Sequence, residues 1–251
     1  MAQPRLSPEA PLTKPRLSIV IPAFNEEARI RSTLDQVIAF LVSRPYTWEI
    51  VVADDGSTDA TARLVSELAD GRPELKLLRL PHRGKGWAVK HGMLAAVGEY
   101  RFLCDADLSM PIEQVERFLP PQVGEGTIVV GSREAPNSRR IGEPAHRHFM
   151  GRLYNRLVRL AAVPGISDTQ CGFKCFPGEQ ASALFQRQRT NGFAFDVEIL
   201  FLARRSGLKV TEIGIDWYFR EESKIRPLLD SVVMTRDLIK IRWLHRRWRR
   251  G

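Results

Sequence analysis

Residues 17–21 read LSIVI and are followed at once by Pro22, the pattern of a short buried strand. Similar apolar runs recur at residues 48–53 (WEIVVA), 75–80 and 100–104. Segments with the apolar spacing of helices lie between these runs, at residues 26–42, 59–69 and 88–97. Strands that alternate with helices of this length predict an α/β fold, with a mostly parallel sheet and helices on both faces.

The basic charge of the chain is concentrated at its C-terminal end. The 251 residues include 38 Lys and Arg against 29 Asp and Glu, a net charge of +9. Residues 236–250 contribute seven of the basic residues and a single aspartate. We therefore expect three parts: a flexible, Pro-rich tail at 1–16, an α/β domain at 17–220, and a basic C-terminal helix at 221–251.

Composition excludes several classes of protein. No apolar run reaches the ~20 residues that a membrane-spanning helix requires, and the N-terminal stretch lacks the apolar core of a signal peptide. The cysteines are Cys104, Cys171 and Cys175, an odd number without a CxxC pair. This count favours a reducing compartment and makes a disulfide scaffold or a zinc finger improbable.

Polar residues follow three of the predicted strands. They are Asn25-Glu26-Glu27, Asp54-Asp55-Gly56 and Asp105-Ala106-Asp107. Because parallel sheets bind ligands beyond the carboxyl ends of their strands, these residues are expected to converge on one site. Asp105 and Asp107 project to one side of an extended segment, where two carboxylates suit a hard cation such as Mg²⁺ or Mn²⁺. The alternative is a helix cap with a solvated neighbour.

Two other polar segments leave the choice open. Asp54 and Asp55 fit either a plain turn before a helix, which Ser57 or Thr58 would cap, or a hydrogen bond to a nucleobase. The Gly84-Lys85-Gly86 turn would let a backbone approach phosphates, although a connecting turn explains it equally well.

Together these motifs resemble those of the family-2 glycosyltransferases. The resemblance is carried by residues 19–27 (IVIPAFNEE), 51–58 (VVADDGST), the GKG of 83–93 and the DAD of 105–107. It implies the GT-A fold, which is Rossmann-like, an inverting mechanism and a nucleotide-sugar donor. Within the family, Gly131-Ser132-Arg133, DTQCGFK at 168–174, FDVE at 195–198 and Ser223-Lys224 resemble the dolichyl-phosphate glucosyltransferases.

The resemblance assigns roles to individual residues. The nucleotide-sugar site would include Pro22, Ala23, Asn25, Glu26, Asp54, Asp55, Lys85, Asp105 and Ala106. Asp105 and Asp107 would hold Mg²⁺ or Mn²⁺, although Ser109 stands where relatives can place a third ligand. Arg133 would contact the acceptor phosphate, with Arg147 or Lys174 as helpers.

The implied reaction is glucosyl transfer from UDP-glucose to a polyprenyl phosphate, with GDP-mannose or a glycan hydroxyl acceptor as alternatives. A phosphate oxygen is already anionic and needs no general base, whereas a hydroxyl acceptor would need one, from Asp196 or Glu198.

The lipid acceptor requires contact with a membrane. Eukaryotic members of the subgroup begin with a membrane anchor that has no counterpart here, so another device is expected. The segment at 148–162 predicts a helix with an apolar stripe opposite Arg152, Arg156 and Arg159. Residues 242–250 (RWLHRRWRR) combine arginines with tryptophans, which suits anionic lipid headgroups or nucleic acid. We favour peripheral binding to the cytoplasmic membrane face, with no nucleic-acid partner.

Overall fold

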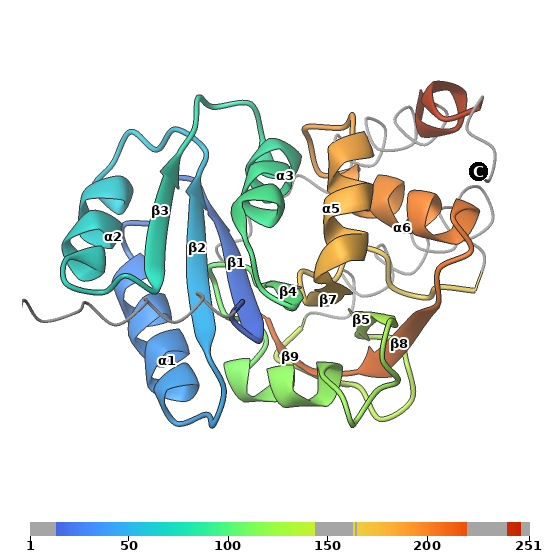
Figure 1. The fold of residues 1–251 in the computed structure, drawn as a ribbon, viewed down its shortest axis with the longest axis horizontal. Coiled ribbons are helices and arrows are strands. Elements are labelled where there is room, and N and C mark those ends of the chain that lie inside the picture. Colours follow the sequence, from blue (N-terminus) through green and yellow to red (C-terminus); the bar gives the residue numbers. More distant parts are fainter. Residues whose placement is uncertain (1–13, 144–162, 164, 220–239, 247–251) are drawn as a thin grey trace, which may run out of the picture.

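The computed structural model describes residues 14–143, 163, 165–219 and 240–246 (Figure 1). The predictions for Arg147, for a helix at 148–162 and for Ser223-Lys224 concern residues outside these ranges. The same holds for most of the predicted N-terminal tail and for most of the predicted C-terminal helix. These expectations therefore stay predictions.

A central sheet of seven strands has the order β3-β2-β1-β4-β7-β5-β8 (Figure 1). Its strands are β1 (Leu17–Ala23), β2 (Trp48–Asp54), β3 (Leu75–Arg79), β4 (Tyr100–Leu103), β5 (Ile128–Ser132), β7 (Lys174–Pro177) and β8 (Val210–Gly214). Strand β7 is antiparallel to both of its neighbours, and the other pairs are parallel. A separate parallel pair joins β6 (Arg139–Ile141) to β9 (Asp216–Tyr218).

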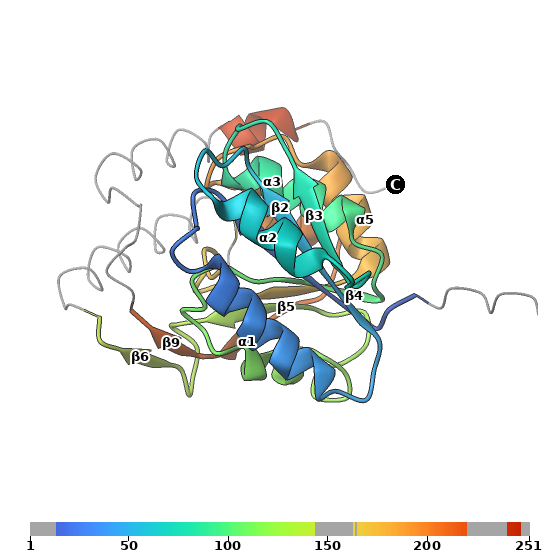
Figure 2. The ribbon, with the colours of Figure 1, turned by 90° about the vertical axis from the view of Figure 1, so that its left-hand side faces the viewer.

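Helices cover both faces of the sheet, as predicted (Figures 1 and 2). One face packs on α1 (Ile30–Val42), α2 (Thr61–Ala69) and the 3₁₀ helix η1 (Ile112–Phe118). The other packs on α3 (Lys85–Ala95), α5 (Gly178–Arg187) and α6 (Phe195–Arg205). Side chains alternate between these layers along β1, where Ile19 and Ile21 join the first core and Val20 joins the second. The α/β prediction is confirmed.

Strand β1 continues past Pro22, where the sequence predicted that it ends. Pairing with β2 extends to Ala23 and Asp54, whereas pairing with β4 stops at Val20. Val20 O accepts a hydrogen bond from Cys104 N, so even-numbered residues of β1 face β4. The missing N–H of Pro22 would point toward β4, beyond the last hydrogen bond between the two strands. The proline therefore removes no hydrogen bond from the sheet.

The helix starts also differ from the predictions. Helix α2 begins at Thr61, whose N–H donates to Asp59 Oδ1 over 2.9 Å, whereas Ser57 Oγ accepts from Asn25 N and so does not cap the helix. Helix α3 begins at Lys85, so that the Gly-Lys-Gly segment forms the start of the helix and not a preceding turn.

The order of the strands places the site. Strands β1, β2 and β3 follow one another outward in one direction, and β4 lies on the opposite side of β1. The strand order thus reverses between β1 and β4, and ligands of open α/β sheets bind beyond the carboxyl ends at such a point. The DAD segment follows β4 and the segment with Asn25 follows β1.

Three phenylalanines tie η1 to the sheet. Phe102, Phe118 and Phe173 are fully buried, and their ring centroids lie 4.7 to 5.8 Å apart in edge-to-face arrangements. Such pairs add attraction to the large apolar area that each ring buries.

Replacing Phe118 tests this part of the core. We expect Phe118→Ala to lower the free energy of unfolding by about 3–5 kcal/mol, because it leaves a cavity between η1 and the sheet. Urea unfolding followed by circular dichroism measures the change. The control is Val42→Ala, at a side chain that is 68% exposed, and a Phe118→Ala effect as small as that of the control would contradict the packing described.

Candidate active site

The segments that follow β1 and β2 are bound to each other. Asn25 adopts a left-handed backbone conformation with φ of 52°. Its N–H donates to Ser57 Oγ over 2.9 Å, and its Oδ1 accepts from Thr58 N over 2.8 Å. Glu26 N donates to Thr61 Oγ1 over 2.7 Å. Two of the three polar strand ends therefore converge, as the sequence predicted, with Pro22 and Ala23 buried beneath them.

Asp54 and Asp55 are both buried and both accept backbone hydrogen bonds. Asp54 Oδ1 accepts from Ser57 N over 3.1 Å, which corresponds to the turn interpretation. Asp55 accepts from Arg83 N and Gly84 N, and His82 Nδ1 lies 2.8 Å from Asp55 Oδ2. Asp55 thus fixes the loop that leads into α3.

Sequence reasoning missed His82. Its ring stacks on Phe24 with centroids 4.1 Å apart and an interplanar angle of 17°. The pair joins the segment after β1 to the loop that Asp55 holds. A lone histidine in a loop carries no spacing signal that could have revealed this contact.

Lys85 lies where this loop meets the DAD segment. Its Nζ is 2.7 Å from Asp105 Oδ1. Burial alone would lower the pKa of Lys85, but the carboxylates of Asp105, Asp196 and Asp107 outweigh it and raise that pKa. The ammonium group is therefore charged at neutral pH and is paired with these carboxylates.

Two hydrogen bonds fix the DAD segment. Thr33 Oγ1 donates to Ala106 O over 2.6 Å, and Asp107 Oδ1 accepts from Ser109 N over 2.8 Å. Two carboxylates on one short segment are the ligands that Mg²⁺ and Mn²⁺ prefer, with a diphosphate and water to complete the shell. In the described part of the chain, no group of three or more His, Cys, Asp or Glu forms a metal cluster. By their chemistry, the carboxylates of Asp105 and Asp107 fit a hard divalent cation.

Gly172 explains part of the DTQCGFK motif, although the sequence did not single it out. A Cβ built on Gly172 would lie 2.0 Å from Asp105 Oδ2 and 2.4 Å from Asp105 Cγ. Any side chain at this position would displace the carboxylate that pairs with Lys85. The glycine therefore allows the 168–174 segment to pack directly on the DAD segment.

Lys174 and Asp196 form a buried ion pair next to Lys85. Lys174 Nζ lies 2.5 Å from Asp196 Oδ1 and donates to Cys171 O. Burial raises the pKa of Asp196, against the lowering effect of Lys174 and Lys85. Lys174 is 1% exposed, and its ammonium group is already bound within the protein. Lys174 is the first residue of β7, and its side chain is buried against Asp196. This placement differs from the predicted contact with an acceptor phosphate.

Arg133 is held by Asp168, which the sequence quoted within a motif but did not assign. Nε and Nη2 of Arg133 donate to the two carboxylate oxygens over 2.6 and 2.8 Å, and Arg133 N donates over 3.0 Å. The guanidinium lowers the pKa of the fully buried Asp168 to about 2, against the raising effect of burial. Glu212 in turn accepts the N–H groups of Ser167 and Asp168.

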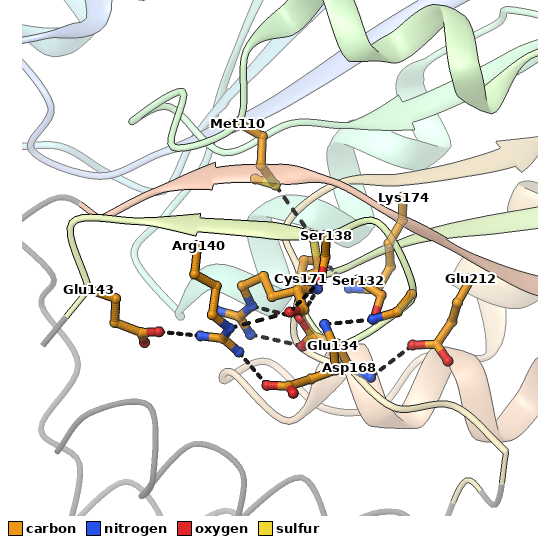
Figure 3. A network of polar contacts seen from close by, with 12 residues as sticks. Met110, Ser132, Glu134, Ser138, Arg140, Glu143, Asp168, Cys171, Lys174 and Glu212 are labelled. Carbon is orange, nitrogen blue, oxygen red and sulfur yellow. Dashed lines mark hydrogen bonds and ion pairs between the residues drawn. The ribbon is translucent and has the colours of Figure 1, made fainter. Parts of the chain in front are cut away.

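A second arginine extends this network (Figure 3). Arg140 contacts Glu134 and Glu143 over 2.5 Å each. The guanidinium carbons of Arg133 and Arg140 lie 5.4 and 5.8 Å from the ring centroid of Trp217 on β9. Sequence analysis missed Arg140 and Trp217 because they lie far apart along the chain and carry no motif.

The three cysteines are buried and free. Burial raises the pKa of Cys171 to about 12 and raises those of Cys104 and Cys175 as well. Thiols with such pKa values stay protonated at neutral pH and are poor nucleophiles.

The Arg133–Asp168 pair predicts a pH-dependent stability. Asp168 ionises at a lower pH in the folded protein than at its ordinary value of 3.8. Its contribution to stability is therefore present above pH ~4 and is lost as the pH falls toward ~2. We expect Asp168→Asn to lower the free energy of unfolding by about 3–5 kcal/mol at neutral pH, because it leaves a partly buried guanidinium without the carboxylate that balances its charge.

Urea unfolding at several pH values measures this difference, which should shrink below pH ~4. Glu67→Gln is the control, because Glu67 pairs with Arg31 and Arg63 at the exposed surface, where an ion pair contributes about 0–1 kcal/mol. A difference for Asp168→Asn that stays constant with pH would contradict the assignment.

Comparisons with known proteins place the fold and the site in context. The sequence profile described as Glycosyl transferase family 2 matches residues 18–180. The dolichyl-phosphate beta-glucosyltransferase of Dictyostelium discoideum is 34% identical, over 93% of this chain and 76% of that protein. A Trichomonas vaginalis protein of the same description is 38% identical over 92% and 74%, and the human one is 33% identical over 93% and 78%.

Solved structures agree on the architecture. Glucosyl-3-phosphoglycerate synthase from Mycobacterium tuberculosis, in complex with Mn²⁺, UDP and glucosyl-3-phosphoglycerate, superposes with a TM-score of 0.63. It is 22% identical, over 90% of this chain and 78% of that one, a similarity that concerns the fold alone. The expected GT-A fold is thereby confirmed, and with the profile match and the relatives above, this chain belongs to glycosyl transferase family 2 and is a glycosyltransferase.

Proposed function

We propose that this enzyme transfers glucose from UDP-glucose to a polyprenyl phosphate of the dolichyl type, with inversion at the anomeric carbon. The observation that carries the proposal is the pairing of Lys85 with Asp105 beside Asp107, which forms a site for a metal-bound diphosphate. The three relatives named above are dolichyl-phosphate beta-glucosyltransferases, which supports glucose over mannose as the sugar.

The donor diphosphate would lie against Lys85, Asp105 and Asp107. A Mg²⁺ or Mn²⁺ ion held by the two aspartates would neutralise the charge that develops on the leaving UDP. Lys85 adds a second positive charge, because its raised pKa keeps it protonated. The buried Lys174–Asp196 pair lies next to Lys85 and would add charges that are already fixed in place.

The acceptor side relies on Arg133. Asp168 fixes the guanidinium from one side, and the Arg133 side chain remains 21% exposed. A phosphate oxygen of the lipid attacks C1 of glucose, the bond from C1 to the UDP oxygen breaks, and the electron pair leaves with UDP. No proton moves, because the attacking oxygen is already anionic at pH 7. The engagement of Asp196 by Lys174 supports this acceptor over a hydroxyl that needs a general base.

We also propose that the enzyme works as a peripheral protein at the cytoplasmic face of a membrane. None of the described helices has the length and hydropathy of a membrane span. In the segment 240–246, Ile241 and His245 are buried, while Trp243 is 60% exposed and Arg246 lies 4.8 Å from the centroid of its ring. A basic and aromatic outer surface suits the anionic lipids of a cytoplasmic leaflet.

A direct assay tests the reaction. Purified protein is incubated with Mn²⁺ or Mg²⁺, a short polyprenyl phosphate, and either UDP-glucose or GDP-mannose. Mass spectrometry of the organic phase then detects a hexosyl-phosphate lipid. We expect a product with UDP-glucose alone. A product with GDP-mannose alone would overturn the assignment of glucose as the sugar. Release of UDP without any lipid product would overturn the assignment of a polyprenyl phosphate as the acceptor.

Asp107 tests the metal assignment. We expect Asp107→Asn to lower kcat/KM for UDP-glucose by roughly a hundredfold or more, because metal coordination stabilises the leaving diphosphate by several kcal/mol. Calorimetry with UDP should also show that Mn²⁺ no longer strengthens binding. Asp70→Asn is the control, at an exposed residue that follows α2. Retention of Mn²⁺-dependent UDP binding in Asp107→Asn would exclude Asp107 as a ligand.

Arg246 tests the membrane contact. We expect Arg246→Ser to weaken partition onto vesicles of phosphatidylserine and phosphatidylcholine by about fivefold, since each basic residue near such a surface contributes about 1 kcal/mol. Sedimentation with vesicles measures the effect, which should diminish at high salt. Arg63→Ser serves as a control with equal charge loss, on the surface of α2. Equal losses in both variants would argue against a specific role for the C-terminal segment.

A further inference from the structure

His245 joins the C-terminal segment to a buried carboxylate in the interior of the protein. His245 Nε2 lies 2.6 Å from Glu198 Oε1. His245 is 8% exposed and Glu198 is fully buried. Because a carboxylate oxygen accepts hydrogen bonds, Nε2 of His245 carries the proton and donates it. Ile241, one turn earlier, packs in a core cluster with Val197 and Leu200 of α6.

Glu198 also binds the backbone of the loop at 188–192. Its Oε1 accepts from Arg189 N over 2.9 Å, and its Oε2 accepts from Thr190 N over 2.7 Å. The carboxylate therefore holds two consecutive backbone N–H groups and the histidine at once. A carboxylate with these three donors fixes a loop firmly, since hydrogen bonds to charged groups are the stronger kind. It also leaves Glu198 poorly placed to act as a general base.

The loop at 188–192 packs on the first turn of α3. Gln188 Nε2 donates to Gly86 O over 2.8 Å, and Trp87 N donates to Asn191 O over 3.1 Å. A Cβ at Gly84 would lie 2.8 Å from Asn191 O, and one at Gly86 would lie 2.7 Å from Thr190 O. The two glycines that flank Lys85 are thus explained by contact between backbones.

We propose that His245 is a positioning residue for the nucleotide-sugar site. Through Glu198 and the loop at 188–192, it fixes the start of α3 so that Lys85 faces Asp105 and the donor diphosphate. This inference rests on the proposed function only in that a nucleoside diphosphate binds at Lys85. It makes His245 a support of the donor site, although His245 lies 53 positions from Gly192 and 56 from Arg189 along the chain.

The test compares three variants by their affinity for UDP. We expect His245→Leu, which removes the donor to Glu198, to weaken UDP binding in the presence of Mn²⁺ by roughly three- to thirtyfold, the range for residues that act on a site through neighbours. His245→Gln should restore most of the affinity, because its amide N–H can replace Nε2–H. Lys240→Ala, on the exposed side of the same segment, should match the unmodified protein.

Hydrogen exchange supplies a readout that does not depend on ligand. In His245→Leu, the amides of Arg189 and Thr190 should exchange faster, together with those at the start of α3, while the amides of β1 and β2 keep their protection. A general loss of stability would instead accelerate exchange throughout. With the acceptor assay, KM for UDP-glucose should rise while KM for the polyprenyl phosphate stays constant.

The outcomes separate this inference from the proposed function. If the unmodified protein does not bind UDP, the proposed function fails. If it binds UDP and folded His245→Leu binds equally well, the role of His245 is overturned. Should His245→Leu fail to fold, His245→Asn provides the same comparison, because its shorter amide keeps a polar side chain but does not reach Glu198.

Discussion

The ion pair between Lys85 and Asp105 is the contact on which the arrangement of the site depends. The two residues come from the start of α3 and from the end of β4, and they meet because the strand order reverses between β1 and β4. A glycine lies next to each of the two residues. Gly86 allows the start of α3 to pack on the loop at 188–192, and Gly172 allows its own segment to pack on the carboxylate of Asp105. Without a Cβ at these positions, backbone segments pack closely enough to bring opposite charges within 2.7 Å.

Charge burial is the second theme of this site. Lys174–Asp196 and Arg133–Asp168 are ion pairs in which at least one partner is fully or almost fully buried. Removing charges from water is costly, so such pairs contribute little to stability when compared with apolar residues. Their value to an enzyme lies in fixed orientation, because charges that are already in place need no reorganisation during a reaction.

The C-terminal segment 240–246 has side chains that face inward and side chains that face outward. Ile241 and His245 pack inward on α6, while Trp243 faces outward. In our proposals, this short segment contributes His245 to the support of the donor site and Trp243 to the surface that meets the membrane. A lipid acceptor enters from a membrane and a nucleotide sugar from water, so an enzyme that joins them gains from a direct structural connection between the two sides.

Much of this could be predicted from the sequence. Apolar runs and helical spacing fix the α/β class, because burial on both faces of a parallel sheet leaves a clear pattern. The motifs after β1, β2 and β4 predicted which strand ends carry polar residues, since those segments are local. Resemblance in the same residues identified the glycosyltransferase family and the GT-A fold, and the comparisons confirmed both.

Tertiary structure decided the partners. Asp55 bonds to the loop before α3, Ser57 accepts a hydrogen bond from Asn25 N and does not cap α2, and Lys174 turns inward to Asp196. His245 and Glu198 lie 47 positions apart along the chain, and no local pattern couples them. A residue type and its spacing specify the local backbone and the chemistry available to a side chain. Which of several possible partners it meets is determined by packing between distant segments, and that appears only when the chain is folded.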